Sequence, residues 1–215
     1  MLIEKANVEI ISNNSYQDML KKIEKIGRVC YKSEDKIKDG SAEKFIKGII
    51  KRGHESVIEH ESISVRFVCD RGVSHEIVRH RIASYSQEST RYCNYTNEKY
   101  GEQITCIDIA SGFEYNLENE NDRKKYDIWL NAMKEAEKSY FQLIELGASP
   151  QEARSVLPNS LKTEIVATMN LRGWRNFFKL RTAKASHPQF REVACMLLEI
   201  FAKDYPVFFE DLLVE

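Results

Sequence analysis

The chain has 215 residues, of which 42% are hydrophobic and 30% charged, and its formal net charge is −1. This length suits one domain over residues 1–215 with a sizeable core, and the near-neutral charge argues against a protein whose whole surface binds nucleic acid. No apolar run is long enough to cross a bilayer, and acids interrupt the apolar N-terminal segment, so we expect a cytoplasmic protein without membrane contact.

The cysteines predict neither a metal site nor disulfides. There are five, none of them in a CxxC pair, and no HExxH or Cys/His cluster accompanies them. Free thiols in a reducing compartment are the expectation for all five.

The first half of the chain predicts alternating strands and helices. Residues 2–11 have the pattern of a strand, and a helix follows Ser15 and ends at Gly27. A second helix is expected over 41–53, and apolar alternation over 62–69 predicts a strand with one buried face. Apolar spacing over 73–84 predicts a third helix with Arg79-His80-Arg81 in its last turn, followed by a polar, Tyr-rich loop over 85–101.

The second half predicts mostly helices. A long helix is expected over 120–146, and Ser149-Pro150-Gln151-Glu152 has the pattern of a capping box with proline at the first helical position. A strand over 162–170 precedes a Trp/Phe-rich helix, and a last helix covers 188–203. Because these elements lack βαβ regularity and no GxGxxG or P-loop is present, we predict an α+β fold: helix-rich, with a small mixed or antiparallel sheet, and not a Rossmann fold.

One stretch is unusually basic and hydroxyl-rich for a nearly neutral chain. Between His75 and Arg91 lie three arginines and two histidines against two glutamates, together with several serines. Arginine forks beside hydroxyls are the chemistry of phosphate recognition, whereas cations at a helix C-terminus also simply favour the helix dipole. The residues alone leave an anionic ligand site and a solvated basic face both open.

A second polar group follows a hundred residues later. It contains Arg154, Asn170, Arg172, Asn176 and Arg181. Asn170 also suits a helix N-cap, and Arg172, Arg175, Lys179 and Arg181 also suit the solvated face of an amphipathic helix. An alternative of another class is a small RNA- or DNA-binding domain that uses the basic stretch and its tyrosines.

The order of these motifs resembles the flavin-dependent thymidylate synthases. Arg79-His80-Arg81, seven residues and then Ser89 match that family's RHR-x7-S signature. A Gly-His-Glu turn at 53–55, Val-Leu-Pro at 156–158 after Arg154, Asn170-x-Arg172 and the closing Leu180-Arg181 follow in the family's order. The resemblance therefore covers most of the chain.

The resemblance implies an enzyme that methylates dUMP to dTMP, with 5,10-methylenetetrahydrofolate as carbon donor and FAD reduced by NADPH as hydride donor. It further implies a homotetramer whose active sites lie at subunit interfaces, without nucleic acid or a metal. Arg181 is implied as the catalytic residue that favours ionisation of dUMP at N3. Ser89 is expected to contact a ligand and not to act as a covalent nucleophile.

The remaining implied site residues fall into two sets, with His54 as a neighbour of folate or flavin. The set for dUMP is Glu76, Arg79, Gln87, Glu88, Ser89, Thr90, Arg91, Arg154 and Arg181. The set for FAD is Ser56, Arg79, His80, Arg81, Gln87, Asn170, Leu171, Arg172 and Asn176. The chain departs from the family's pattern at Glu76, where some members have Gln, and in a longer segment after Arg181.

Overall fold

The strands form two small sheets in the computed structural model, which describes residues 1–12 and 15–213. Four antiparallel strands have the order β2-β3-β6-β4, and β1 pairs in parallel with β5. The strands are β1 (Leu2–Glu4), β2 (Asn7–Ile10), β3 (Ser62–Asp70), β4 (Ser84–Gln87), β5 (Thr105–Ile107) and β6 (Lys162–Asn170). With no βαβ unit in the four-stranded sheet, the predicted α+β class is confirmed.

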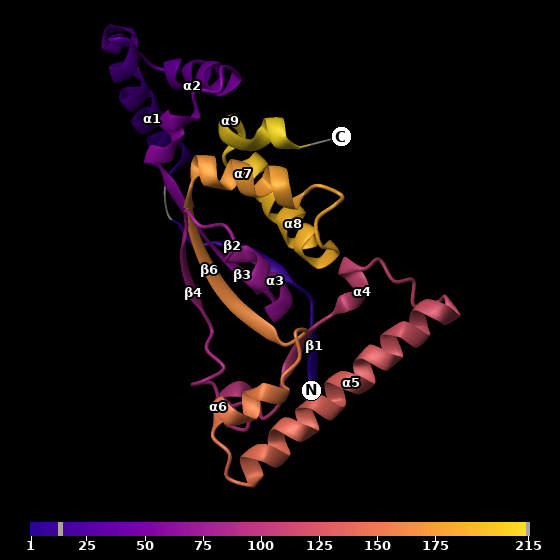
Figure 1. Cartoon of the computed structure of the whole chain (residues 1–215). Coiled ribbons are helices and arrows are strands. Elements are labelled where there is room, and N and C mark those ends of the chain that lie inside the picture. Colours follow the sequence, from indigo (N-terminus) through magenta and orange to yellow (C-terminus); the bar gives the residue numbers. More distant parts are fainter. Residues whose placement is uncertain (13–14, 214–215) are drawn as a thin grey trace.

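Helices occupy both ends of an elongated molecule. In Figure 1, α1 and α2 lie at one end and the long α5 at the other, with the sheet between them. The α-helices are α1 (Tyr16–Tyr31), α2 (Ser41–Lys51), α3 (Arg71–Ile77), α4 (Ile109–Gly112), α5 (Glu120–Glu145), α6 (Pro150–Ala153), α7 (Leu171–Arg181), α8 (Pro188–Asp204) and α9 (Pro206–Phe209). Short 3-10 turns are η1 (Glu34–Lys36), η2 (Glu55–His60), η3 (Glu98–Tyr100), η4 (Arg154–Val156) and η5 (Glu210–Leu212).

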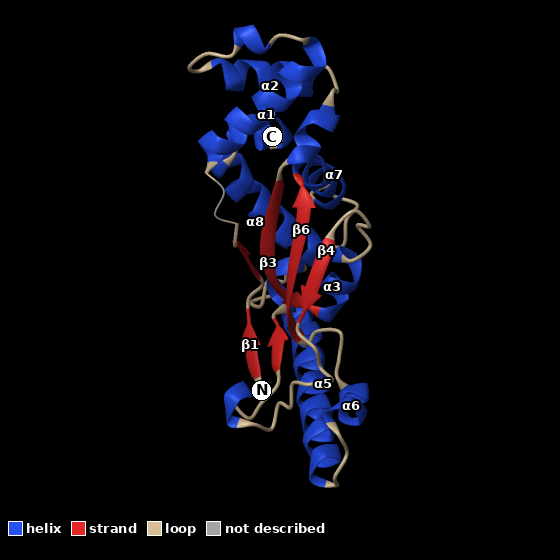
Figure 2. Cartoon of the chain, turned by 90° about the vertical axis from the view of Figure 1, so that its left-hand side faces the viewer, coloured by secondary structure: helices blue, strands red, loops and turns tan. Residues whose placement is uncertain are grey.

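The central pair of strands, β3 and β6, is in register from Ser62 opposite Asn170 to Asp70 opposite Lys162. Successive side chains of a strand point to opposite faces, and every second residue of β6 is buried. Figure 2 shows the sheet face that no helix covers, with α3, α7 and α8 behind it. One face of the sheet is therefore the core and the other is polar.

Aromatic side chains fill the covered face. Trp174 and Phe177 of α7 are fully buried and contact Phe67 of β3, and Phe201 of α8 packs on Trp174 with ring centroids 5.5 Å apart. Burying such rings is the main term that stabilises a fold of this kind. A smaller apolar cluster lies between α5, α6 and β5, with Tyr140 at its centre.

Several local signals act as expected. Ser149 and Glu152 form the reciprocal capping box at the start of α6. Asn170 caps α7 by accepting from the backbone of Gly173 at 2.7 Å, so its predicted capping role is confirmed.

Other predictions were wrong. Residues 2–11 form two strands that belong to different sheets, because β1 pairs with β5 and β2 with β3. Arg79, His80 and Arg81 follow α3, which ends at Ile77, and the expected loop begins with a strand, β4, over 84–87. Pairing with β6 gives this polar segment its strand conformation, which its own alternation does not signal.

The first helix also runs past Gly27 and ends at Tyr31. Lys32, not glycine, adopts the left-handed conformation after it, with φ of 46°. Gly27 is buried inside the helix, where an added Cβ would lie 2.5 Å from the Phe45 ring of α2. This glycine therefore permits close approach of two helices. No helix within residues 1–12 and 15–213 combines the length and hydropathy needed to span a membrane.

Replacing Gly27 with alanine should destabilise the protein by about 1–3 kcal/mol, because the Phe45 ring must move. Gly48→Ala in α2 is the matched control. There the added methyl meets only the flexible end of Arg52, so better helix propensity should stabilise by roughly 0.5–1 kcal/mol. Urea unfolding of the three proteins tests the contrast, and equal effects of the two substitutions would contradict it.

Candidate active site

A cavity of about 680 Å³ lies between the turn after α3 and the side of α7 that runs from Arg172 to Leu180. Its rim is completed by η2, the 3-10 turn that precedes β3. The lining residues are Glu55, Glu59, Arg79, His80, Arg81, Ile82, Asn170, Arg172, Gly173, Asn176, Lys179 and Leu180. Six residues of the expected FAD set are thus brought together from two segments ninety residues apart.

Hydrogen bonds to backbone groups fix the turn that carries the Arg-His-Arg motif. The Tyr85 hydroxyl shares its single proton between the carbonyls of Ile77, at 2.9 Å, and His80, at 2.6 Å. The backbone amide of Arg79 donates to the carbonyl of Glu76, and that of His80 donates to the carbonyl of Ile77. Burial raises the pKa of Tyr85 to about 12, so this hydroxyl keeps its proton and the turn keeps its shape.

The cations of the cavity differ in how far they are already neutralised. Arg172 contacts Glu59 at 2.5 Å and Glu55 at 3.8 Å, and Lys179 lies 3.9 Å from Glu55. Arg79 and Arg81 are exposed and make no ion pair within the described residues. These two guanidinium groups are therefore available to an anion.

Arg181, at the end of α7, is held by two side chains from the α3 side. Its Nε donates to Nε2 of His80 at 3.0 Å, and its Nη1 donates to a carboxylate oxygen of Glu76 at 3.2 Å. The guanidinium also lies over the Phe190 ring, 4.6 Å from the centroid. Glu76, where the chain departs from the family's pattern, therefore faces an arginine.

His80 is neutral at physiological pH. Burial lowers its pKa to about 4, and the positive charge of Arg181 lowers it in the same direction. Because Nε2 accepts the Arg181 hydrogen bond, the ring proton belongs on Nδ1. The neutral imidazole of His80 thus positions the Arg181 guanidinium without adding a further positive charge beside it.

The expected nucleotide loop, residues 87–91, begins where β4 ends. The Gln87 amide donates to Ser74 at 2.9 Å and to the buried Thr163 at 3.2 Å. The backbone amide of Glu88 donates to the carbonyl of Glu164, and the Glu88 carboxylate accepts a hydrogen bond from the Tyr95 hydroxyl at 3.1 Å. Both side chains are thus engaged with the protein itself.

The tip of this loop contacts α6 and η4. Arg91 donates to Gln151 at 2.9 Å, and Arg154 donates to the buried Thr90 at 3.4 Å. Both guanidinium groups are exposed and free of ion pairs in the described part of the chain. The Ser89 hydroxyl accepts from the Arg91 amide at 3.3 Å, and the hydrogen bonds of the described residues join it to no histidine or carboxylate.

The cavity and the loop over 87–91 lie at opposite ends of β4, and Glu76, Arg79 and Arg181 of the expected dUMP set lie at the cavity end. Ser84 pairs with Thr168 near the cavity, whereas Gln87 pairs with Ile165 beside the nucleotide loop. From Ile82 to Ser89 the extended chain spans roughly 20 Å, so the cavity and the loop tip do not converge on one point of this chain.

Besides Gln87, the rest of the loop over 87–91 and Arg154 beside it, three expected residues stand apart from the cavity. Leu171 is fully buried in the core and its amide bonds to Glu61, so its side chain faces no ligand. Ser56 is exposed on η2 but does not line the cavity. His54 stacks on Tyr31 of α1, with ring centroids 6.3 Å apart.

The acidic rim and the buried position of one arginine differ from what the sequence predicts. Glu55 and Glu59 lack any motif signal beyond the Gly-His-Glu turn. Arg175 was expected on a solvated face but is buried, forming a bidentate pair with Asp211 at 2.7 Å and contacting Glu55 at 3.3 Å. The described residues contain no group of three or more His, Cys, Asp or Glu side chains placed to hold a metal ion.

The low pKa of His80 predicts a pH-dependent stability. The unfolded chain takes up this proton near pH 6.5 but the folded chain only near pH 4, so the free energy of unfolding should fall as pH drops through this window. His80→Gln should remove about 1–2 kcal/mol of that fall between pH 7 and pH 4.5, after allowance for solvent screening. Urea unfolding of both proteins at both pH values measures it, and identical pH profiles would contradict the assignment.

The sequence matches a family model described as "Thymidylate synthase complementing protein" over residues 10–207. The "Flavin-dependent thymidylate synthase" of Pyrococcus furiosus is 36% identical over 172 residues, which cover 80% of this chain and 67% of that protein. The protein of the same name from Geobacter sulfurreducens is 31% identical over 191 residues, covering 86% and 78%.

A solved structure shares the fold over nearly the whole chain. It is the UMP/dUMP methylase PolB from Streptomyces cacaoi bound with 5-Br dUMP, with a TM-score of 0.79, 25% identity and coverage of 98% of this chain and 96% of that one. The motifs, the fold and these likenesses agree, and the chain belongs to the flavin-dependent thymidylate synthase family.

Proposed function

We propose that this protein converts dUMP to dTMP, taking the carbon from 5,10-methylenetetrahydrofolate and the hydride from FAD reduced by NADPH. The observation that carries the proposal is the position of Arg181. Glu76 and His80 hold its guanidinium next to a cavity that contains Arg79 and Arg81, two arginines without an ion pair among the described residues. The names of the relatives and the nucleotide bound to PolB support the same reaction.

The loop over 87–91 suits the nucleotide. Arg91 and Arg154 present two exposed guanidinium groups, and Gln151 and Thr90 hold them in place. Guanidinium groups bind phosphate through paired N–H donors, so we assign the dUMP phosphate to this pair. Ser89 and the amides around it add hydrogen-bonding groups beside it, as a ligand contact and not as a nucleophile.

The cavity at the Arg-His-Arg turn suits FAD. Arg79 and Arg81 can neutralise a diphosphate, and the Asn176 amide can pair with the polar edge of a ring. When bound, the reduced flavin supplies the hydride. Arg172 and Lys179 are already paired with the acidic rim, so Arg79 and Arg81 are expected to contribute most to the affinity.

Arg181 is assigned the activation of dUMP. Its guanidinium stays charged at any physiological pH, and a fixed positive charge beside the pyrimidine stabilises the anion formed when N3 loses its proton. That anion enriches C5 in electrons, which favours attack on the methylene carbon. Glu76 and His80 engage only two of the five N–H donors, so the others remain for the pyrimidine.

Glu76 then acts mainly through Arg181. A carboxylate next to a phosphate would repel it, but this one is paired at 3.2 Å. We infer that Glu76 orients the guanidinium, and that dUMP approaches the paired arginine and not an isolated acid.

We further propose a homotetramer with active sites at subunit interfaces. The cavity and Arg181 lie at one end of β4 and the nucleotide loop at the other, so one dUMP cannot reach both within a single chain. A second copy must supply the loop that holds the phosphate if the pyrimidine is to meet Arg181 and FAD. The sheet face without helices, visible in Figure 2, offers a polar surface for such contacts.

Replacing Arg181 with alanine should lower the rate of dTMP formation by at least about 10²–10³-fold, the usual effect of losing one preorganised charge-stabilising group. Arg123→Ala on α5, which removes an exposed arginine far from the cavity, is the control. The rate of dTMP formation from dUMP, measured by chromatography for the wild type and both variants, tests this prediction. If Arg181→Ala kept more than a tenth of the rate, Arg181 would not be the activating residue.

The flavin assignment can be tested without turnover. The purified protein should show a flavin absorption spectrum that dUMP perturbs, and Arg79→Ala with Arg81→Ala should weaken FAD binding at least about tenfold. Arg123→Ala with Lys134→Ala removes the same charge on α5 and should leave FAD binding intact. A colourless wild-type protein that takes up no added FAD would overturn the flavoenzyme proposal.

A further inference from the structure

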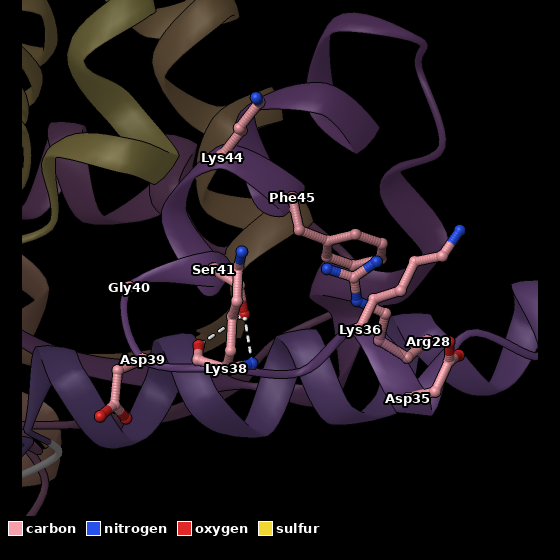
Figure 3. Close-up of a pocket in the computed structure, with 9 residues that line it drawn as sticks. All are labelled: Arg28, Asp35, Lys36, Lys38, Asp39, Gly40, Ser41, Lys44 and Phe45. Carbon is pink, nitrogen blue, oxygen red and sulfur yellow. Dashed lines mark hydrogen bonds between the residues drawn. The ribbon is translucent and has the colours of Figure 1, made fainter.

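A second cavity, of about 650 Å³, lies between the end of α1 and the start of α2 (Figure 3). We call it the α1–α2 pocket. Its lining residues are Arg28, Asp35, Lys36, Lys38, Asp39, Gly40, Ser41, Lys44 and Phe45. None of them belongs to the residue sets assigned above to dUMP or FAD.

Three lysines give the pocket an available positive charge. Lys36 comes from η1, Lys38 from the connection that follows and Lys44 from α2, and all three are exposed. Within residues 1–12 and 15–213 none of them forms an ion pair. In Figure 3 the Lys38 and Lys44 side chains extend in one direction, whereas the Asp39 carboxylate points in the other.

The wall behind these lysines is fixed by buried contacts. Arg28 pairs with Glu24 at 2.7 Å and lies over the Phe45 ring, 4.4 Å from its centroid. Glu24 is 3% exposed, and the Ser41 hydroxyl, which has one proton to donate, lies 2.8 Å from both of its carboxylate oxygens. Because Glu24 already neutralises Arg28, the lining charges without an ion pair in the described part of the chain are the three separate ammonium groups and the carboxylates of Asp35 and Asp39, and the positive charges prevail.

A line of aromatic rings joins this pocket to the candidate active site. Phe45 packs edge-on against Tyr31, with centroids 6.3 Å apart, and Tyr31 stacks on His54 at 6.3 Å with an interplanar angle of 18°. The Tyr31 hydroxyl also hydrogen-bonds to Nδ1 of His54 at 2.5 Å. His54 immediately precedes η2, whose Glu55 and Glu59 line the FAD cavity.

We infer that the α1–α2 pocket binds the carboxylates of the γ-linked glutamate tail of the folate co-substrate, with the folate ring system towards His54. This inference rests on the proposed function, because that function supplies the folate. A tail of successive glutamates presents single carboxylates at intervals, which matches three ammonium groups carried by separate segments. A phosphate group would instead favour a free arginine fork, and here the arginine is already engaged by Glu24.

The inference predicts a preference for long tails. With wild-type protein, the KM for methylenetetrahydrofolate pentaglutamate should be about tenfold below that for the monoglutamate, since several exposed ion pairs of modest strength add together. Replacing Lys36, Lys38 and Lys44 by alanine should bring this ratio close to one. The control replaces Lys134, Lys138 and Lys203, exposed lysines elsewhere, and should keep the ratio.

A binding measurement separates this inference from the proposed function. Calorimetric titration with p-aminobenzoyl-pentaglutamate should show binding to wild type that weakens with salt and is lost in the Lys36/Lys38/Lys44 variant. If wild type makes dTMP from the monoglutamate but shows neither the tail preference nor this binding, the inference fails while the proposed function stands. If no folate supports dTMP formation, the proposed function itself fails. An increase in the KM for NADPH in place of the pentaglutamate effect would overturn the inference in favour of a nucleotide phosphate.

Discussion

The pairing of β3 with β6 is the constraint on which the rest of the structure depends. Each of these nine-residue strands ends in a side chain that caps the next helix: Asp70 accepts from the amide of Val73 at the start of α3, and Asn170 from that of Gly173 at the start of α7. Because the strands are antiparallel, the two helices leave opposite ends of the ladder and cover the same face. The register that buries Phe67 under Trp174 also lets the ends of α3 and α7 meet.

The contact between the ends of α3 and α7 explains why several arginines lie close together at the cavity. The C-terminal ends of two helices carry partial negative charge, which favours Arg181 in the last turn of α7 and the arginines just after α3. Glu76 adds a full negative charge, and burial keeps His80 neutral, so the repulsion among the arginines is reduced. The arrangement leaves Arg79 and Arg81 unpaired in the described chain, which is the property that an anionic cofactor requires.

The wrong predictions share a cause. Gly27 looked like a helix stop, yet close packing against Phe45 is what requires a glycine there, and no local pattern distinguishes the two roles. The polar segment Ser84–Gln87 lacks the alternation of a strand but is paired with β6. The sequence pattern places Arg175 on the solvated face of α7, but the residue is buried and forms an ion pair with Asp211, thirty-six positions later. In each case a partner distant in sequence decided the outcome.

The sequence by itself determined the elements whose signals are local: the capping box at Ser149, the Asn170 cap, the long α5 and the strand β6. It also determined the family, because RHR-x7-S and the later motifs are specific as an ordered set. Only the tertiary structure decided that Glu76 faces Arg181, 105 positions away, that Leu171 points into the core, and that the cavity and the loop over 87–91 lie at opposite ends of β4. These facts depend on strand register and on the directions in which two helices leave the sheet, and long-range contacts of that kind leave no periodicity in the chain.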